Sequence, residues 1–238
     1  MLIRPQNSPL PEEPASRLRN VRARIATAAL AAGRNEDSVT LVAVSKGHSA
    51  AAIVMLAQSG VEHFGESYLQ EALPKLTALA GLELTWHFIG RLQTNKTRTV
   101  AERFSWVHGV DRLRLAERLA AQRPHFAPPL NVCIQVKLAS DATKGGAGAE
   151  QTASLATAIR TLPRLRLRGL MCILPDDLES AVQRARFSAV HELYEQLNRD
   201  GAGLDTLSMG MSGDFELAIA AGSTLVRIGT ALFGARSD

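Results

Sequence analysis

Short apolar runs alternate with amphipathic stretches along most of this chain. The apolar runs have the length of single β-strands and lie at 40–45, 61–65, 84–90, 105–110, 130–138, 165–174, 204–210 and 224–229. Between them, apolar residues recur at helical spacing; in 180–197 one predicted face carries Val182, Ala185, Ala189, Leu193 and Leu197. Eight strands that alternate with helices favour an α/β fold of one (β/α)8 TIM-type barrel over an open doubly wound sheet.

The first 32 residues have a different pattern. Residues 1–14 hold four of the ten prolines, and we expect a flexible tail there. After it, Leu18, Val21, Ile25 and Ala28 recur at helical spacing and predict a leading N-terminal helix. No linker divides the rest, so the sequence predicts a tail at 1–14 and one barrel domain at 15–238, with no second domain after the barrel.

Composition excludes several other classes of protein. Hydrophobic residues make up 46% and charged residues 21%, and neither a signal peptide nor a long apolar segment is present, so we expect a cytoplasmic protein with no membrane partner. The net charge of +4 is spread along the chain apart from "RLRLR" at 164–168, which predicts no nucleic-acid partner. Cys133 and Cys172 lie in apolar runs without the spacing of metal ligands, and we expect buried reduced thiols and no metal site.

Lys46 ends the strongly apolar run at 40–45, in a place where a charge must be paired, neutralised or used chemically. In barrels of this class the functional groups lie where strands end. A desolvated lysine amine is a nucleophile that forms Schiff bases with aldehydes. The alternatives are a side chain that reaches out to solvent or one that pairs with a carboxylate such as Glu66.

Two glycine turns follow the last two predicted strands, "SMGMS" at 208–212 and "VRIGT" at 226–230. Each could be a simple helix cap, but exposed backbone N–H groups and hydroxyls also bind phosphate. Their position matches the usual phosphate site of such barrels. A lysine that holds an aldehyde and a phosphate cradle on the same rim together indicate pyridoxal 5′-phosphate (PLP).

The chain resembles a known family in several stretches. These are "LVAVSK" at 41–46, "HFGESYLQEA" at 63–72, "WHFIGRLQTNK" at 86–96, "VHGVDR" at 107–112, "GLM" at 169–171 and "LSMGMSGDFELAIAAGSTLVRIGTALFGAR" at 207–236. They are similar to the PLP-binding, or PLP homeostasis, family, whose fold is similar to the N-terminal barrel of bacterial alanine racemase. The resemblance covers about residues 15–236.

This resemblance implies a set of cofactor-binding residues and no catalytic residue. Lys46 is expected to form the Schiff base (internal aldimine) with PLP, and Arg227 to face the pyridine nitrogen. The residues implied for the phosphate are Ser208, Gly210, Gly229 and Thr230.

Some positions depart from the family pattern or have two interpretations. Ser67 in "GES" replaces the amide of the usual Gly-Glu-Asn, Arg91 replaces the proline of Ile-Gly-Pro, and "GHSA" at 47–50 replaces a threonine-led turn. Ser67 and His87 are expected to line the pocket. His87 could instead be a hydrogen-bonded core residue.

Three functions compete for this site. The resemblance implies a PLP carrier or regulator in vitamin B6 and amino-acid homeostasis, with PLP-requiring apo-enzymes as partners, a monomer or weak dimer and no strong turnover. The alternatives are a PLP-dependent amino-acid racemase of the alanine racemase type and a Schiff-base aldolase. Arg227 favours the carrier, because an arginine only donates and so keeps the ring nitrogen unprotonated, which weakens the electron sink that turnover needs.

Overall fold

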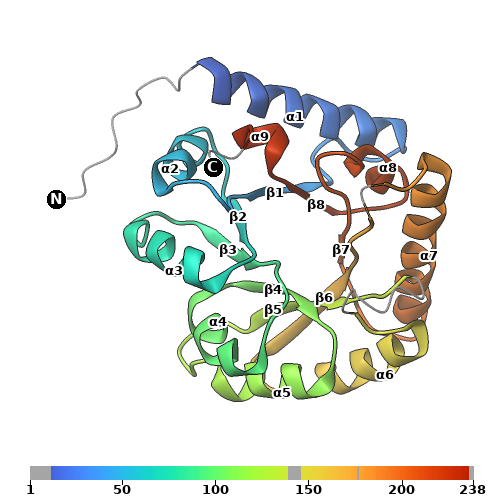
Figure 1. The fold of residues 1–238 in the computed structure, drawn as a ribbon. Helices are drawn as coiled ribbons and strands as arrows, with labels where there is room; N and C mark the ends of the chain where they lie inside the picture. The colour runs from blue at the N-terminus through green and yellow to red at the C-terminus, as the bar shows by residue number, and fades with distance from the viewer. Residues whose placement is uncertain (1–11, 139–145, 176, 236–238) are drawn as a thin grey trace.

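The structure is a closed barrel of parallel strands surrounded by helices (Figure 1). It is a computed structural model that describes residues 12–138, 146–175 and 177–235. The strands are β1 (Thr40–Val44), β2 (His63–Glu66), β3 (Thr85–Phe88), β4 (Trp106–Val110), β5 (Leu130–Gln135), β6 (Leu165–Met171), β7 (Thr206–Ser208) and β8 (Leu225–Ile228). They pair in chain order, and β8 pairs back with β1. All eight predicted strands and the barrel are therefore confirmed within the described residues.

Helices follow each strand and cover the outside of the barrel; all but α9, which comes after β8, connect consecutive strands (Figure 1). They are α2 (Ala50–Gln58), α3 (Leu69–Ala78), the short η1 (Thr94–Lys96) with α4 (Thr97–Arg103), α5 (Leu113–Gln122), α6 (Ala149–Arg160), α7 (Ser180–Arg199), α8 (Phe215–Ala220) and α9 (Thr230–Phe233). The helix predicted at 180–197 is confirmed, but its buried face is displaced: Val182 is 38% exposed, whereas Phe187 and Val190 are buried. Among the described helices, none is long and apolar enough to cross a membrane.

The leading helix, α1 (Glu12–Ala31), lies along the outside of the barrel beside α8 and α9 (Figure 1). Leu18, Val21 and Ile25 are buried, as their spacing predicted. The helix starts earlier than expected, so residues 12–14 are helical rather than part of the tail. Pro14 lies in the first turn, where its missing N–H breaks no helical hydrogen bond. Residues 1–11 of the expected tail lie outside the described residues.

The hydrophobic core of the described residues has two separate clusters. A large apolar cluster joins the strands to the helices that cover them. A second, smaller cluster consists of Trp106, Cys133 and Met171 from β4, β5 and β6. Cys133 and Cys172 are both free and buried, as predicted, and burial raises the pKa of each thiol to about 12.

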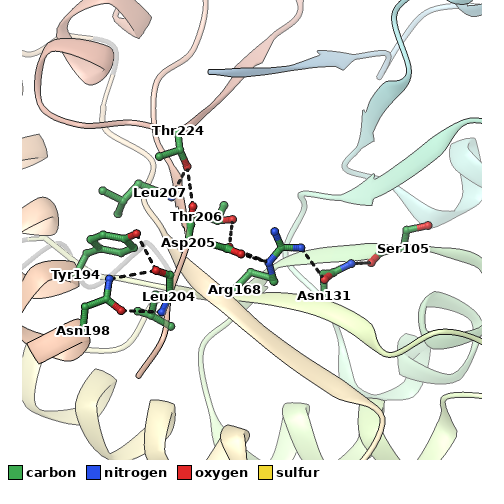
Figure 2. A network of polar contacts seen from close by, with 10 residues as sticks. All are labelled: Ser105, Asn131, Arg168, Tyr194, Asn198, Leu204, Asp205, Thr206, Leu207 and Thr224. Carbon is green, nitrogen blue, oxygen red and sulfur yellow. Dashed lines mark hydrogen bonds and ion pairs between the residues drawn. The ribbon is translucent and has the colours of Figure 1, made fainter. Parts of the chain in front are cut away.

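Arg168 joins three strands at a bulge in β6 (Figure 2). Its Nε donates to both carboxylate oxygens of Asp205 at 2.8 and 2.9 Å, and its Nη1 donates to Oδ1 of Asn131 at 3.0 Å. The guanidinium also lies 4.7 Å from the ring centroid of Trp106. One arginine of "RLRLR" is therefore a structural element of the barrel rather than a solvated side chain.

The same network continues to β8 through two threonines (Figure 2). Thr206 donates to Oδ1 of Asp205 at 2.8 Å, and the N–H of Leu207 donates to Oγ1 of Thr224 at 2.9 Å. Burial alone would raise the pKa of Asp205, but the hydrogen bonds from Arg168 and Thr206 hold it below the usual value. These contacts connect β5 through β8 near the amino ends of the strands.

Close contact between β6 and β7 requires a glycine at position 169. A Cβ at Gly169 would lie 1.6 Å from the carbonyl oxygen of its partner Thr206. We expect Gly169→Ala to lower the free energy of unfolding by about 3 kcal/mol or more, because the two strands must separate locally. Urea unfolding followed by circular dichroism measures this loss. The control is Gly81→Ala, where an added Cβ meets nothing within 4 Å; equal midpoints for the two variants would contradict the prediction.

Candidate cofactor-binding site

Lys46 lies in a turn directly after β1, at the carboxyl end of the barrel, and is half-buried. The preceding Ser45 is fully buried, and its hydroxyl donates to Oε1 of Glu66 at 2.6 Å. The following Gly47 has a φ of +77°, a conformation that favours glycine. Ser45 and Gly47 therefore restrict the conformation of the turn on both sides of Lys46.

A buried ion pair between Lys75 and Glu66 supports this turn. Nζ of Lys75 donates to the carbonyl oxygen of Ser45 at 2.7 Å and to Oε1 of Glu66 at 2.8 Å. Nζ also donates to Glu71, and Oε1 of Glu71 accepts from the N–H of Gly47. Lys75 thereby holds the residues on both sides of position 46.

Glu66 is fully buried, and its pKa is raised by burial, against the opposing effect of the hydrogen bonds from Lys75 and Ser45. Sequence alone offered Glu66 as a partner for Lys46. In the structure its Oε1 is paired with Lys75. Sequence reasoning missed Lys75; its signal would have been the spacing of four residues from Glu71 on one helix.

The turn of Lys46 lies beside the start of α9, because β1 pairs with β8. Gly229 precedes α9, and a Cβ there would lie 3.4 Å from the carbonyl oxygen of Val44. Farther along the two segments, the ring of His48 stacks on Phe233 with centroids 4.5 Å apart. The expected lysine and one expected phosphate turn are therefore brought together.

A hydroxyl that sequence reasoning did not single out lies at the start of α9. Oγ of Ser212 accepts from the N–H of Ala231 at 3.5 Å. Thr230, the first residue of α9, is exposed. The N–H groups of Leu232 and Phe233 donate to the carbonyl oxygen of Gly229, so the N–H and hydroxyl of Thr230 are the donors that this end offers to a ligand. Ser212 was visible as the last hydroxyl of "SMGMS".

Ser208 and Gly210, in the same turn, have partners inside the protein. Oγ of Ser208 accepts from Nη1 of Arg227 at 2.7 Å and is hydrogen-bonded to Nδ1 of His108 at 2.8 Å. Gly210 has a φ of +93°, and a Cβ there would lie 2.8 Å from Cα of Phe215. Close packing against α8 therefore accounts for Gly210, and the barrel interior holds the hydroxyl of Ser208.

Arg227 lies inside the barrel and is only 4% exposed. Its Nη1 donates to the carbonyl oxygen of Ser208 at 2.6 Å, and its Nη2 donates to that of Cys172 at 2.8 Å. With the bond to Oγ of Ser208, three of the five N–H donors are engaged at the carboxyl ends of β6 and β7. Burial lowers the pKa of Arg227.

His87 is a hydrogen-bonded residue of the barrel interior. It is fully buried, bonds to His63 and His108 at 2.9 Å each, and stacks on Trp106 at 5.3 Å. Burial, and then the charges of His108 and His63, lower the pKa of His87 well below the usual value. His87 is therefore a hydrogen-bonded core residue, which was the alternative to lining the pocket.

Two of the three departures from the family pattern lie together. Ser67 and Arg91 line one cavity of about 690 Å³ beyond the ends of β2 and β3, together with Lys96 and Arg112. Gly90 is required here, because a Cβ would lie 2.0 Å from the carbonyl oxygen of Ser67. Among the described residues there is no group of three or more His, Cys, Asp or Glu side chains placed to hold a metal ion.

Comparisons with known proteins show which family the chain is similar to. The sequence model of the alanine racemase N-terminal domain matches residues 17–237. The pyridoxal phosphate homeostasis protein of Pseudomonas aeruginosa is 55% identical over 222 residues, which cover 93% of this chain and 95% of that protein. The protein of the same name from Escherichia coli K12 is 47% identical over 225 residues, covering 93% and 96%.

A solved structure extends the comparison to three dimensions. PipY of Synechococcus elongatus, determined with PLP bound, superposes with a TM-score of 0.83 at 38% identity and covers 93% of this chain and 100% of that chain. Sequence and fold therefore agree over nearly the whole chain, which belongs to the family of pyridoxal phosphate homeostasis proteins and shares the fold of the alanine racemase N-terminal domain.

Proposed function

We propose that this protein binds PLP covalently on Lys46 and serves vitamin B6 and amino-acid homeostasis as a carrier or regulator without strong turnover. The observation that carries this proposal is the anchored turn of Lys46 beside the amino end of α9. The names of the relatives and the PLP bound in PipY support it. PLP-requiring apo-enzymes are the proposed acceptors. A monomer or weak dimer is the proposed form.

The donors at the rim fit the chemistry of PLP. An amine at position 46 condenses with the aldehyde, forming one C=N bond and releasing one water, and the reverse step releases PLP. Such a link is reversible, as a carrier requires. The free, buried thiols Cys133 and Cys172 support the proposed cytoplasmic location, where thiols stay reduced.

The phosphate is proposed to lie at the start of α9. Gly229 and Thr230 would supply backbone N–H groups, and Thr230 and Ser212 would supply hydroxyls. Family resemblance implied Ser208 and Gly210 for the phosphate. Because the hydroxyl of Ser208 is bonded to Arg227 and His108, these two residues would mainly support the site rather than contact the phosphate. The site then has a lysine on one side and phosphate donors on the other.

Arg227 is proposed to face the ring nitrogen. Its contacts with Ser208 and Cys172 fix the guanidinium at the carboxyl end of the barrel. They use three of its five N–H donors, so the other donors can serve a ligand. Bound PLP supplies an electron sink, which is weak while its ring nitrogen stays unprotonated. A donor that cannot accept a proton therefore favours holding the cofactor over racemase or transaminase turnover.

The first prediction from this proposed function concerns the covalent link. Purified protein should show the visible absorption band of lysine-bound PLP, and borohydride should remove it by reducing the C=N bond. Peptide mapping should then find the pyridoxyl group on Lys46. Lys46→Ala should lose the band, whereas Lys96→Ala, at an exposed lysine, should keep it. A label on Lys137, or an unchanged band in Lys46→Ala, would refute the assignment.

The second prediction concerns the phosphate. Thr230→Val and Ser212→Ala should each weaken PLP binding by about 1.5–3 kcal/mol, which is roughly 10- to 150-fold, because each removes a hydrogen bond to a charged group. Fluorescence titration of the apo-protein with PLP measures the change. The exposed Ser154→Ala is the control. Unchanged affinity in a double variant of Ser212 and Thr230 would rule out this cradle.

The third prediction concerns the anchor of the turn. Lys75→Met leaves Glu66 buried without its cation, and we expect a loss of about 3–5 kcal/mol in the free energy of unfolding at pH 7. Burial raises the folded-state pKa of Glu66, so the loss should shrink as the pH falls and the carboxylate is protonated. Urea unfolding at pH 7 and pH 5 measures both effects.

Two variants control this measurement. Lys96→Met removes an exposed lysine and should change stability by less than about 0.5 kcal/mol. Adding Glu66→Gln to Lys75→Met should recover much of the loss, because the buried charge is gone. A loss that is the same at both pH values, or that the second substitution leaves unchanged, would show that the buried charge is not its cause.

A further inference from the structure

A continuous chain of hydrogen bonds runs through the barrel from one end to the other. His63 lies at the start of β2, and its Nδ1 is 2.9 Å from Nε2 of His87 in β3. Nδ1 of His87 is 2.9 Å from Nε2 of His108 in β4, and Nδ1 of His108 is 2.8 Å from Oγ of Ser208 at the end of β7. Since β4 and β7 are not neighbours in the sheet, the last bond crosses the barrel interior.

The two inner histidines are neutral. His87 and His108 are fully buried. Burial, and then the positive charge of Arg227, lower the pKa of His108 to about 3. A neutral imidazole has one N–H donor and one acceptor nitrogen, so every bond in the chain must point in the same direction.

The apo-protein favours one of the two directions. Ser208 is fully buried, and its hydroxyl accepts from Arg227, so its own proton goes to Nδ1 of His108. His108 then donates through Nε2 to His87, and His87 donates through Nε2 to His63. In the opposite direction, Ser208 accepts from both His108 and Arg227, and its proton must find an acceptor elsewhere.

The far end of the chain reaches solvent. His63 is half-buried and lines a cavity of about 670 Å³ at the amino ends of β1 and β2. The charged groups that face it there are Arg22, Glu36, Asp37 and Glu62. Burial lowers the pKa of His63, and Glu62 opposes this effect. His63 is therefore the member of the chain that exchanges protons with water, through Nε2.

We propose that His63, His87, His108 and Ser208 form a proton path between this cavity and the PLP pocket on the opposite face of the barrel. The part of this path at the ligand rests on the proposed function, which places the ring nitrogen beside Arg227. A proton that enters Oγ of Ser208 from the pocket displaces the hydroxyl proton to His108. One proton then moves along each histidine bond, and Nε2 of His63 releases one to water.

The path also carries protons inward, and again one proton leaves for each proton that enters. Water protonates Nε2 of His63, each histidine passes one proton on, and Ser208 takes one from His108 while its own goes to a basic atom in the pocket. The charged form of His63 has an N–H at both nitrogens and fits only this second direction. The charge state of His63 on one face thus decides whether Ser208 offers its proton to the opposite face.

Histidine ¹⁵N NMR of the apo-protein tests the path without any cofactor. At pH 8, His87 and His108 should both be the tautomer with the proton on Nε2. As His63 takes up its charge below about pH 6.5, both inner rings should shift their proton to Nδ1 at the same midpoint and stay neutral. His63→Gln keeps a hydrogen-bonding group but cannot ionise, so it should abolish this shift. His125→Gln, at an exposed histidine, should leave it unchanged.

The outcomes are distinct. Titration of His63 with no change at His108, opposite tautomers in the two inner rings, or a shift that persists in His63→Gln would each overturn the proton path. The wild-type titration decides the matter even if His63→Gln does not fold. PLP binding is measured separately by absorbance, so failure to bind PLP would overturn the proposed function and leave the NMR result intact.

Discussion

The pairing of β1 with β8 is the contact on which the rest of the structure depends. It joins the first and last strands of the sheet, closes the barrel and leaves no open edge between them. It also places the turn that bears Lys46 against the start of α9, although the two segments lie near opposite ends of the chain. Lys46, Gly229 and Thr230 all lie at this junction.

The interior of the barrel is unusually polar for its class. Such barrels are commonly filled by layers of branched apolar side chains, whereas this one encloses three histidines, Ser208 and Arg227 beside a small apolar cluster. Burying these groups is costly unless each is hydrogen-bonded, and the chain of bonds meets that condition. A continuous polar path through a barrel is then a consequence of satisfying each member in turn.

Hydrogen bonds within the protein also hold the turn of Lys46 and the side chain of Arg227 in place. Lys46 lies in a turn whose two flanking residues are held by Lys75 and Glu71, and Arg227 is held by two carbonyl oxygens and a hydroxyl. Groups that are fixed before a ligand arrives lose little conformational freedom on binding. Except for the exposed contact between Gly47 and Glu71, these contacts are buried in the barrel.

The sequence alone determined the fold class, the eight strands and the rim on which Lys46, Gly229 and Thr230 lie. Apolar runs and helical spacing are local patterns, and parallel strands that alternate with helices have few ways to close. Family resemblance added the cofactor. The early start of α1 and the displaced face of α7 were missed, because local patterns leave the ends and rotation of a helix loosely defined.

Only the tertiary structure decided which side chains meet. Sequence could not show that Ser208 turns into the barrel while Ser212 stays at the rim, that Lys75 pairs with Glu66, or that His63 joins His87 and His108. These contacts depend on register, strand tilt and the bulges in β4 and β6, which bring together residues far apart in the chain. Periodicity reports how one element is buried, whereas contacts across a barrel arise only when all of its strands are in place.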